Sequence, residues 1–280
     1  QDQASHTAQF FFQKTNRVPD ASYDVYLLIG QSNMAGRGRM IEGDEAVIDE
    51  NVFILDDKGD VVPARNPLNQ YSSIRKDISM QQIGPGFSFV KKIAEKTGRK
   101  ILLVVNARGG SNLNEWIKGV EKGYYEEAVR RTKQALKHGQ LKGILWHQGE
   151  SNSRDTDYLE KLSGMVSGLR SELDAEKVPF IAGELAYWRS TFLVFNDMIK
   201  DIDKLISSTA YTASELIVGA DADSLGANIN DYYATLSAEQ KYEYNKNIKF
   251  TTNESLATDK ILHVGKDSTM ILIYDQESTV

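Results

Sequence analysis

The chain has 280 residues, of which 41% are hydrophobic and 26% charged, and it contains no cysteine. A chain of this length buries enough apolar surface to fold without disulfides or a metal, and the missing thiols exclude a disulfide scaffold and cysteine catalysis. The formal net charge of −6 disfavours nucleic acid as a partner, because phosphate binding requires a basic surface, and no apolar run has the length of a membrane span.

The first 22 residues are polar and irregular, and we interpret 1–22 as an N-terminal extension. The sequence starts at Gln1 rather than Met, and its polar start is typical of an exported chain after signal-peptide cleavage. A truncated expression product would start in the same way. We expect the protein to be secreted or to reside in the periplasm or cell envelope.

After this extension, apolar runs alternate with amphipathic segments. Continuous apolar runs predict buried strands, and apolar residues at helical spacing predict helices. The predicted strands cover 23–30, 52–56, 100–105, 143–147, 178–185 and 215–220. The predicted helices cover 87–98, 124–139, 158–176 and 191–206. This alternation predicts an α/β fold, a single domain over 23–280 in which a parallel sheet is covered by helices on both faces.

Ligands of such sheets bind beyond the carboxyl ends of the strands. The first strand is followed there by GQSNMAGRGR (30–39), in which Ser32 lies beside backbone N–H groups that a turn would leave free. This is not the G-x-S-x-G elbow, because Met34 occupies the position of the last glycine. An isolated serine after a strand is also a common helix cap, so Ser32 alone does not establish a catalytic site.

The strand at 100–105 is followed by NARGGSNLNEW (106–116). The paired Gly109 and Gly110 let the backbone approach a ligand closely, and either N–H suits an oxyanion. A phosphate cradle is a rival interpretation, but the Lys-Ser/Thr ending of a P-loop is absent. A simple turn is the structural alternative.

The strand at 143–147 runs into WHQGESNS (146–153), which gathers polar side chains around a glycine. The amide of Gln148 suits a developing negative charge. Glu150 suits the binding of substrate hydroxyls or the bracing of loops. We interpret His147 as a structural residue, as is usual for a lone histidine at a strand end.

Together, the blocks at 30–38, 109–116 and 146–152 resemble the SGNH hydrolase superfamily. The closer similarity is to its sialate O-acetylesterase-like and acetyl-xylan-esterase-like branch, carbohydrate esterase family six, over roughly residues 23–190. The resemblance implies a three-layer α/β/α sandwich with a central parallel sheet. It also implies a serine esterase that removes acetyl groups from a polysaccharide or sialic acid and requires no cofactor.

By this resemblance Ser32 is the nucleophile and forms an acetyl-enzyme that water hydrolyses. The N–H of Ser32, Gly110 (with Gly109 as the close alternative) and Gln148 would bind the oxyanion. The polar and aromatic side chains of these loops suit contacts with sugar. The candidates for such contacts are Gln31, Asn33, Arg108, Gly109, Trp116, Glu150 and Asn152.

The mechanism also requires a histidine to take the serine proton and a carboxylate to orient that histidine. The family ends with an Asp-x-x-His-Phe block, and His263 is the histidine that suits it. Asp259 lies four residues before His263 instead of three, and Val264 follows in place of the aromatic residue. Asp259 is the predicted carboxylate, and Asp267 or Glu150 could substitute for it.

Residues 221–258 are polar, rich in tyrosine and unlike the family, so we interpret them as an insertion or as a divergent helix and loop covering the site. DADSLGANIND (221–231) matches a calcium loop only in part, because Leu225 and Tyr232 stand where oxygen ligands are required. We therefore predict no metal.

Two other functions remain open. A lipase or thioesterase of the same superfamily would need an apolar trough for an acyl chain, whereas the loops here are polar. A non-catalytic carbohydrate-binding protein on an inactivated hydrolase fold is the second alternative, and the irregular spacing of Asp259 and His263 is its support.

Overall fold

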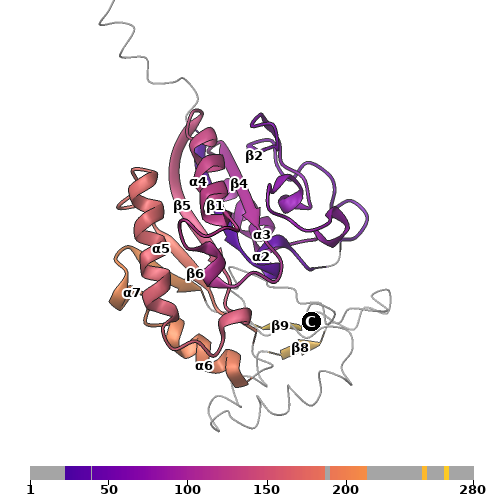
Figure 1. Ribbon diagram of the computed structural model, residues 1–280. Helices are drawn as coiled ribbons and strands as arrows, with labels where there is room; N and C mark the ends of the chain where they lie inside the picture. The colour runs from indigo at the N-terminus through magenta and orange to yellow at the C-terminus, as the bar shows by residue number, and fades with distance from the viewer. Residues whose placement is uncertain (1–22, 39, 187–189, 213–247, 251–261, 265–280) are drawn as a thin grey trace, which may run out of the picture.

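The computed structural model describes residues 23–38, 40–186 and 190–212, together with two short strands at 248–250 and 262–264. A seven-stranded sheet has the order β3-β2-β4-β1-β5-β6-β7 (Figure 1). Its strands are β1 (Tyr23–Gly30), β2 (Val52–Leu55), β3 (Val61–Pro63), β4 (Ile101–Ala107), β5 (Gly139–His147), β6 (Phe180–Gly183) and β7 (Thr209–Thr212). Only β3 runs antiparallel to its neighbour within this sheet, so the predicted parallel sheet is confirmed except at one edge.

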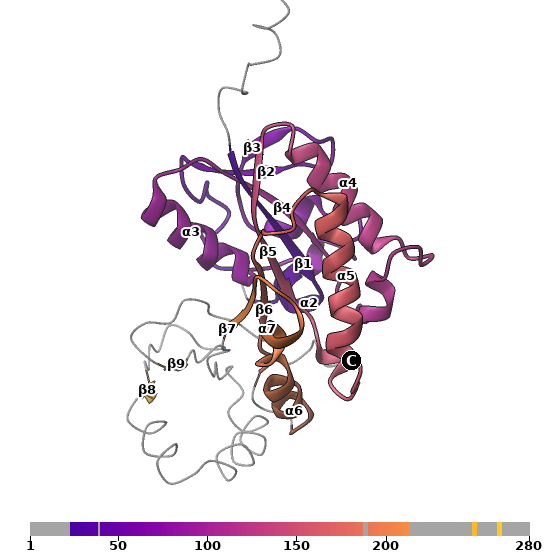
Figure 2. The ribbon, with the colours of Figure 1, turned by 90° about the vertical axis from the view of Figure 1, so that its left-hand side faces the viewer.

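Helices cover both faces of the sheet. Figure 2 shows α3 on one side and α4 and α5 on the other. The helices are α2 (Ser32–Ala35), α3 (Pro85–Thr97), α4 (Tyr124–Ala135), α5 (Tyr158–Glu172), α6 (Ser190–Ile199) and α7 (Ile202–Leu205). The short 3-10 turns are η1 (Leu68–Tyr71), η2 (Ile78–Met80), η3 (Leu113–Trp116) and η4 (Glu150–Asn152). This is the expected three-layer α/β/α sandwich.

The side chains of β1 explain why the layers form. Leu27 and Ile29 pack in the cluster that includes α4 and α5, whereas Leu28 packs in the cluster that includes α3. Alternate residues of a strand point to opposite faces, so a strand with a helix layer on each side must be apolar throughout. The helix α3 has a proline in its first turn and stops at Gly98, which has φ +60°, as the sequence indicates for its end. The helices α4 and α5 end at Ala135 and Glu172, before the predicted ends at 139 and 176.

Two local predictions were wrong. The single helix predicted at 191–206 is divided into α6 and α7, because the N–H of Asp201 turns back to the carbonyl of Met198 and ends the first helix. The short strands β3 and β7 were not predicted, since each is only partly buried and lacks a continuous apolar run. The proposed extension 1–22, the predicted strand 215–220 and most of 221–258 lie outside the described residues.

The three central strands end at the same level, and this positions the site. Gly30 at the end of β1 lies opposite Ala107 of β4 on one side and His147 of β5 on the other. The loops that leave these strands therefore start side by side. Gly30 has φ +143°, and a Cβ there would lie 2.1 Å from the carbonyl oxygen of His147, so no other residue fits without displacing β5.

A separate antiparallel pair consists of β8 (Ile248–Phe250) and β9 (Leu262–Val264), in which Lys249 lies opposite His263. Among the helices that the structure describes, none is long and apolar enough to cross a membrane.

Candidate active site

Ser32 is the first residue of α2 and lies directly after the end of β1. The N–H of Gln31 donates to the carbonyl oxygen of His147 at 2.9 Å, which fixes the turn between β1 and α2. Ser32 is 9% exposed and stands at the carboxyl edge of the sheet. A hydroxyl is thereby held at the edge where parallel sheets bind their ligands.

Gly109, in the loop after β4, lies beside this serine. The N–H of Arg108 donates to the carbonyl oxygen of Gly30 at 3.0 Å and attaches the loop to β1. A Cβ on Gly109 would lie 3.9 Å from the Ser32 Cα and 2.5 Å from Arg37 Nη2. Within the described part of the chain, no hydrogen bond uses the N–H of Ser32, Gly109 or Gly110. Free N–H groups from two adjacent loops are what a developing oxyanion requires.

In this structure the amide of Gln148 is hydrogen-bonded within the protein, and its predicted role at the oxyanion stays a prediction. Its Nε2 lies 3.0 Å from Gln31 Oε1, 3.2 Å from the Ser111 carbonyl oxygen and 2.6 Å from Asn152 Oδ1. The Tyr158 hydroxyl is 2.9 Å from its Oε1, and burial raises the pKa of that hydroxyl, which keeps it protonated. Since an amide has two hydrogens, none is left for an oxyanion in this arrangement.

Three residues predicted to contact sugar have partners within the protein in this structure. Gln31 and Asn152 are buried, and both accept hydrogen bonds from the amide of Gln148. Trp116 is fully buried, packs edge-on against Trp146 at a ring distance of 5.3 Å and has no face available to a sugar. These three side chains pack and hydrogen-bond within the protein and hold the site loops together.

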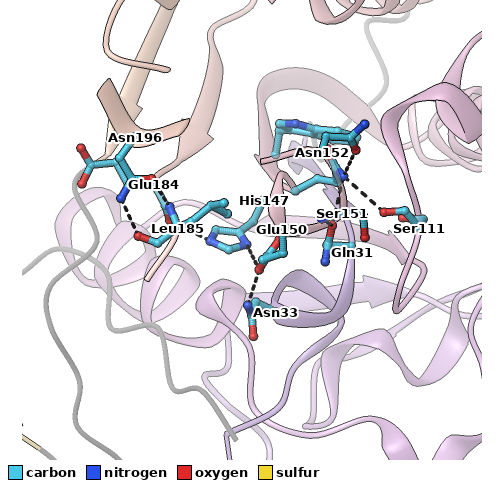
Figure 3. A network of polar contacts seen from close by, with 12 residues as sticks. Gln31, Asn33, Ser111, His147, Glu150, Ser151, Asn152, Glu184, Leu185 and Asn196 are labelled. Atoms are coloured by element: carbon cyan, nitrogen blue, oxygen red, sulfur yellow. Dashed lines mark hydrogen bonds and ion pairs between the residues drawn. The ribbon is translucent and has the colours of Figure 1, made fainter. Parts of the chain in front are cut away.

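A second polar cluster is formed by Asn33, His147 and Glu150 (Figure 3). Asn33 Nδ2 donates to Glu150 Oε1, and His147 Nδ1 lies 4.0 Å from the same oxygen. His147 Nε2 is 3.0 Å from the carbonyl oxygen of Glu184, so it must carry the hydrogen, because a carbonyl only accepts. This contact agrees with the structural interpretation of His147.

Three atoms of this cluster are buried without a hydrogen-bond partner: Asn33 Oδ1, His147 Nδ1 and Glu150 Oε2. Buried acceptors of this kind are costly unless a donor reaches them. The Glu150 carboxylate therefore has one oxygen fixed by the protein and one oxygen that still requires a donor.

The structure describes only part of the predicted pair of His263, the base, and Asp259, its carboxylate. The backbone of His263 lies on β9, whereas Asp259 and Asp267 lie outside the described residues. Their roles therefore stay predictions. Within the described ranges, no group of three or more histidine, aspartate or glutamate side chains has the arrangement of a metal site.

The loop between β3 and α3 supports the site and was not predicted to do so. Asn69 brackets Ala107, accepting from its N–H at 2.9 Å and donating to its carbonyl oxygen at 3.1 Å. Asn106 Oδ1 accepts from the N–H of Ser73 at 3.0 Å. These contacts fix the start of the glycine loop, and no motif in the sequence distinguishes their residues from ordinary polar loop residues.

The three-layer α/β/α fold around a mostly parallel sheet is that of the SGNH superfamily. The chain belongs to the carbohydrate esterase family described as sialic acid-specific acetylesterases, whose sequence model matches residues 22–241. The match ends before Asp259 and His263. A probable carbohydrate esterase of Arabidopsis thaliana is 32% identical over 186 residues, which are 58% of this chain and 68% of that protein.

Solved structures show the same fold. The X-ray structure of the Arabidopsis protein has a TM-score of 0.63 and 20% identity, covering 77% of this chain and 100% of its own. The crystal structure of NanS has a TM-score of 0.57 and 18% identity, covering 78% of this chain and 88% of its own.

Proposed function

We propose that this chain is a carbohydrate O-acetylesterase in which Ser32 carries the acetyl group during turnover. The observation that carries the proposal is the position of Ser32 at the level where β1, β4 and β5 end, with Gly109 beside it. Membership of the esterase family supports the reaction class. The acetylated sugar is part of a polysaccharide or a sialic acid.

In the proposed mechanism the Ser32 hydroxyl attacks the acetyl carbonyl carbon while His263 takes the hydroxyl proton. The carbonyl oxygen becomes an oxyanion and accepts from the N–H groups of Ser32 and Gly110, with Gly109 as the alternative donor. The same histidine returns the proton to the departing sugar oxygen. Water then attacks the acetyl-serine, and acetate leaves. Gln148 contributes by holding the loops in place.

Asp259 is the carboxylate that the motif assigns to His263, and Glu150 is the candidate that a structural observation favours. The Oε2 atom of Glu150 is buried and has no hydrogen-bond donor among the described residues. An imidazole N–H of His263 would supply this donor. We expect Glu150→Gln to lower kcat by about 10⁴-fold, the size of effect known for the orienting aspartate of a serine triad, and Asp259→Asn to have a smaller effect. Steady-state kinetics on an aryl acetate compare the two variants. The variant His263→Ala shows how far kcat falls when the predicted base itself is removed. The reverse order of losses would assign the role to Asp259.

The reaction class is tested by acetate release from acetylated saccharides. We expect activity on acetyl esters to fall steeply as the acyl chain lengthens, because the loops around Ser32 are polar. A preference for long acyl chains would instead identify a lipase or thioesterase. Sugar binding without acetate release would identify a non-catalytic binding protein. A fluorophosphonate probe followed by peptide mass analysis locates the reactive serine, which we expect to be Ser32.

We also propose that the protein acts outside the cytoplasm, because acetylated polysaccharides are extracellular substrates. Fractionation of the source cells, with immunodetection of this chain, checks it. Detection only in the cytoplasmic fraction would contradict it.

A further inference from the structure

Arg37 follows α2 by two residues, and its side chain reaches the glycine loop beside Ser32. A Cβ on Gly109 would lie 2.5 Å from Arg37 Nη2 and 3.9 Å from the Ser32 Cα. The guanidinium and the backbone of the serine therefore both lie within 4 Å of one point beside Gly109. The proposed reaction forms its oxyanion in this place, because the proposed donors are the N–H groups of Ser32 and of Gly110 or Gly109.

The guanidinium of Arg37 is held in a defined position. Directly after it in the chain, Gly38 and Ile83 exchange two backbone hydrogen bonds of 2.9 Å. Arg37 Nη1 donates to the carbonyl oxygens of Gly36 at 2.7 Å and Met80 at 2.8 Å. These contacts direct Nη2 toward the glycine loop. A charge that is already in place when the reaction starts needs no rearrangement in the transition state, and this makes it effective.

The position of Arg37 also accounts for the glycine at 109. Gly110 has φ +74°, a conformation that favours glycine, whereas Gly109 is not among the residues with positive φ. The backbone of Gly109 would thus accept another residue, but the first side-chain carbon would overlap Arg37 Nη2. The missing side chain leaves room for the guanidinium beside the peptide groups of the loop.

We propose that the positive charge of Arg37 stabilises the oxyanion that forms when Ser32 attacks the ester. The inference rests on the proposed function and adds to it a residue that acts through its charge. A neutral ester gains little from this charge, whereas the negative oxygen of the tetrahedral intermediate is attracted to it. Loss of the charge should therefore lower kcat and leave KM nearly unchanged.

The first test compares Arg37→Met with Arg37→Lys on a neutral aryl acetate. We expect Arg37→Met to lower kcat by between about tenfold and a hundredfold, which is less than the loss of a direct oxyanion donor, because the guanidinium is partly exposed. The KM of this variant should stay within about twofold of the original value. Arg37→Lys keeps a positive charge and should recover most of the lost rate.

The second test uses phenylboronic acid as a mimic of the intermediate. Its boron binds the Ser32 oxygen while the hydroxyl proton passes to the base, and the product is a tetrahedral anion. The inhibition constant of this compound should rise in Arg37→Met by about the factor by which kcat/KM falls, because both report binding of the same negative charge.

The third test replaces Gly109 by alanine, which keeps the backbone N–H but displaces Arg37 Nη2. We expect Gly109→Ala to lower kcat in the unmodified protein and to lower it much less in the Arg37→Met background, because the charge is already absent there. This non-additivity is the signature of two residues that act through one contact.

Arg99→Met is the matched control. Arg99 donates to Asp24 Oδ1 at 2.9 Å near the start of β1, at the opposite edge of the sheet from Ser32. Its replacement removes a positive charge and an ion pair, and kcat should not change.

Three results would overturn the role of Arg37: an unchanged kcat in Arg37→Met, a change confined to KM, or an unchanged inhibition constant for the boronate. Equal losses of kcat in Arg37→Met and Arg37→Lys, together with a lower unfolding temperature in both, would reduce Arg37 to a structural brace and overturn it as well. An active unmodified protein and an inactive Ser32→Ala variant would leave the esterase proposal standing in each case. Failure of the unmodified protein to hydrolyse any acetyl ester would overturn the esterase proposal itself.

Discussion

Replacing Ser32 by alanine should lower kcat for an aryl acetate by at least about a thousandfold, because the acetyl group would have no hydroxyl to accept it. The substitution removes one oxygen atom that makes no hydrogen bond to a described residue, so the thermal unfolding midpoint should stay within about 2 °C of the unmodified protein. Initial-rate measurements and a thermal melt together separate lost chemistry from lost structure.

Ser171→Ala is the matched control for this experiment. Ser171 lies on the exposed surface of α5, far in sequence from the three site loops, and its hydroxyl has no role in the mechanism. Its variant should retain full activity. If Ser32→Ala still hydrolysed the ester at the original rate, Ser32 would not be the nucleophile.

Gly30→Ala should destabilise the protein by more than about 4 kcal/mol, the range of severe single substitutions. The new methyl group would lie 2.1 Å from the carbonyl oxygen of His147 and 2.9 Å from its nitrogen, and a φ of +143° is strained for any residue with a Cβ. Relief requires β1 and β5 to separate at the centre of the sheet. Urea unfolding measures the loss, and soluble expression is expected to fall with it.

Gly164→Ala is the control for the glycine substitution. Gly164 lies inside α5 with nothing within 4 Å of a Cβ placed there. Alanine has the higher helix propensity, so this variant should be more stable by about 0.5–1 kcal/mol. Equal stability of Gly30→Ala and the unmodified protein would mean that β1 and β5 do not approach as closely as the structure shows.

The parts of the fold that could be predicted are those in which burial leaves a clear pattern. The strand β1 is apolar on both faces and α3 stops at a glycine, so sequence was sufficient for these two features, whereas α3 starts at Pro85 and not at the predicted residue 87. The strand β7 has no fully buried residue and joins the sheet through backbone hydrogen bonds, which any sequence can form. Only tertiary packing distinguishes such a segment from a loop.

The site shows the same division. The serine and the glycine pair were predicted because a backbone position at a strand end determines what they can do. Sequence gives no indication of whether a loop residue points inward to the protein or outward to a ligand, and the partners that Gln148 and Trp116 have within the protein appear only in the structure.

The amide of Gln148 joins the segment after β1, the segment after β4 and the turn η4 through three buried contacts. If any one of these segments opened, buried polar atoms of the other two would lose their hydrogen-bond partners. The three segments should therefore unfold together. The loops around Ser32 are therefore ordered when the chain folds. The conformational entropy of these loops is lost during folding and not when the substrate binds. Heating should consequently abolish turnover over the same temperature interval in which the sheet itself unfolds.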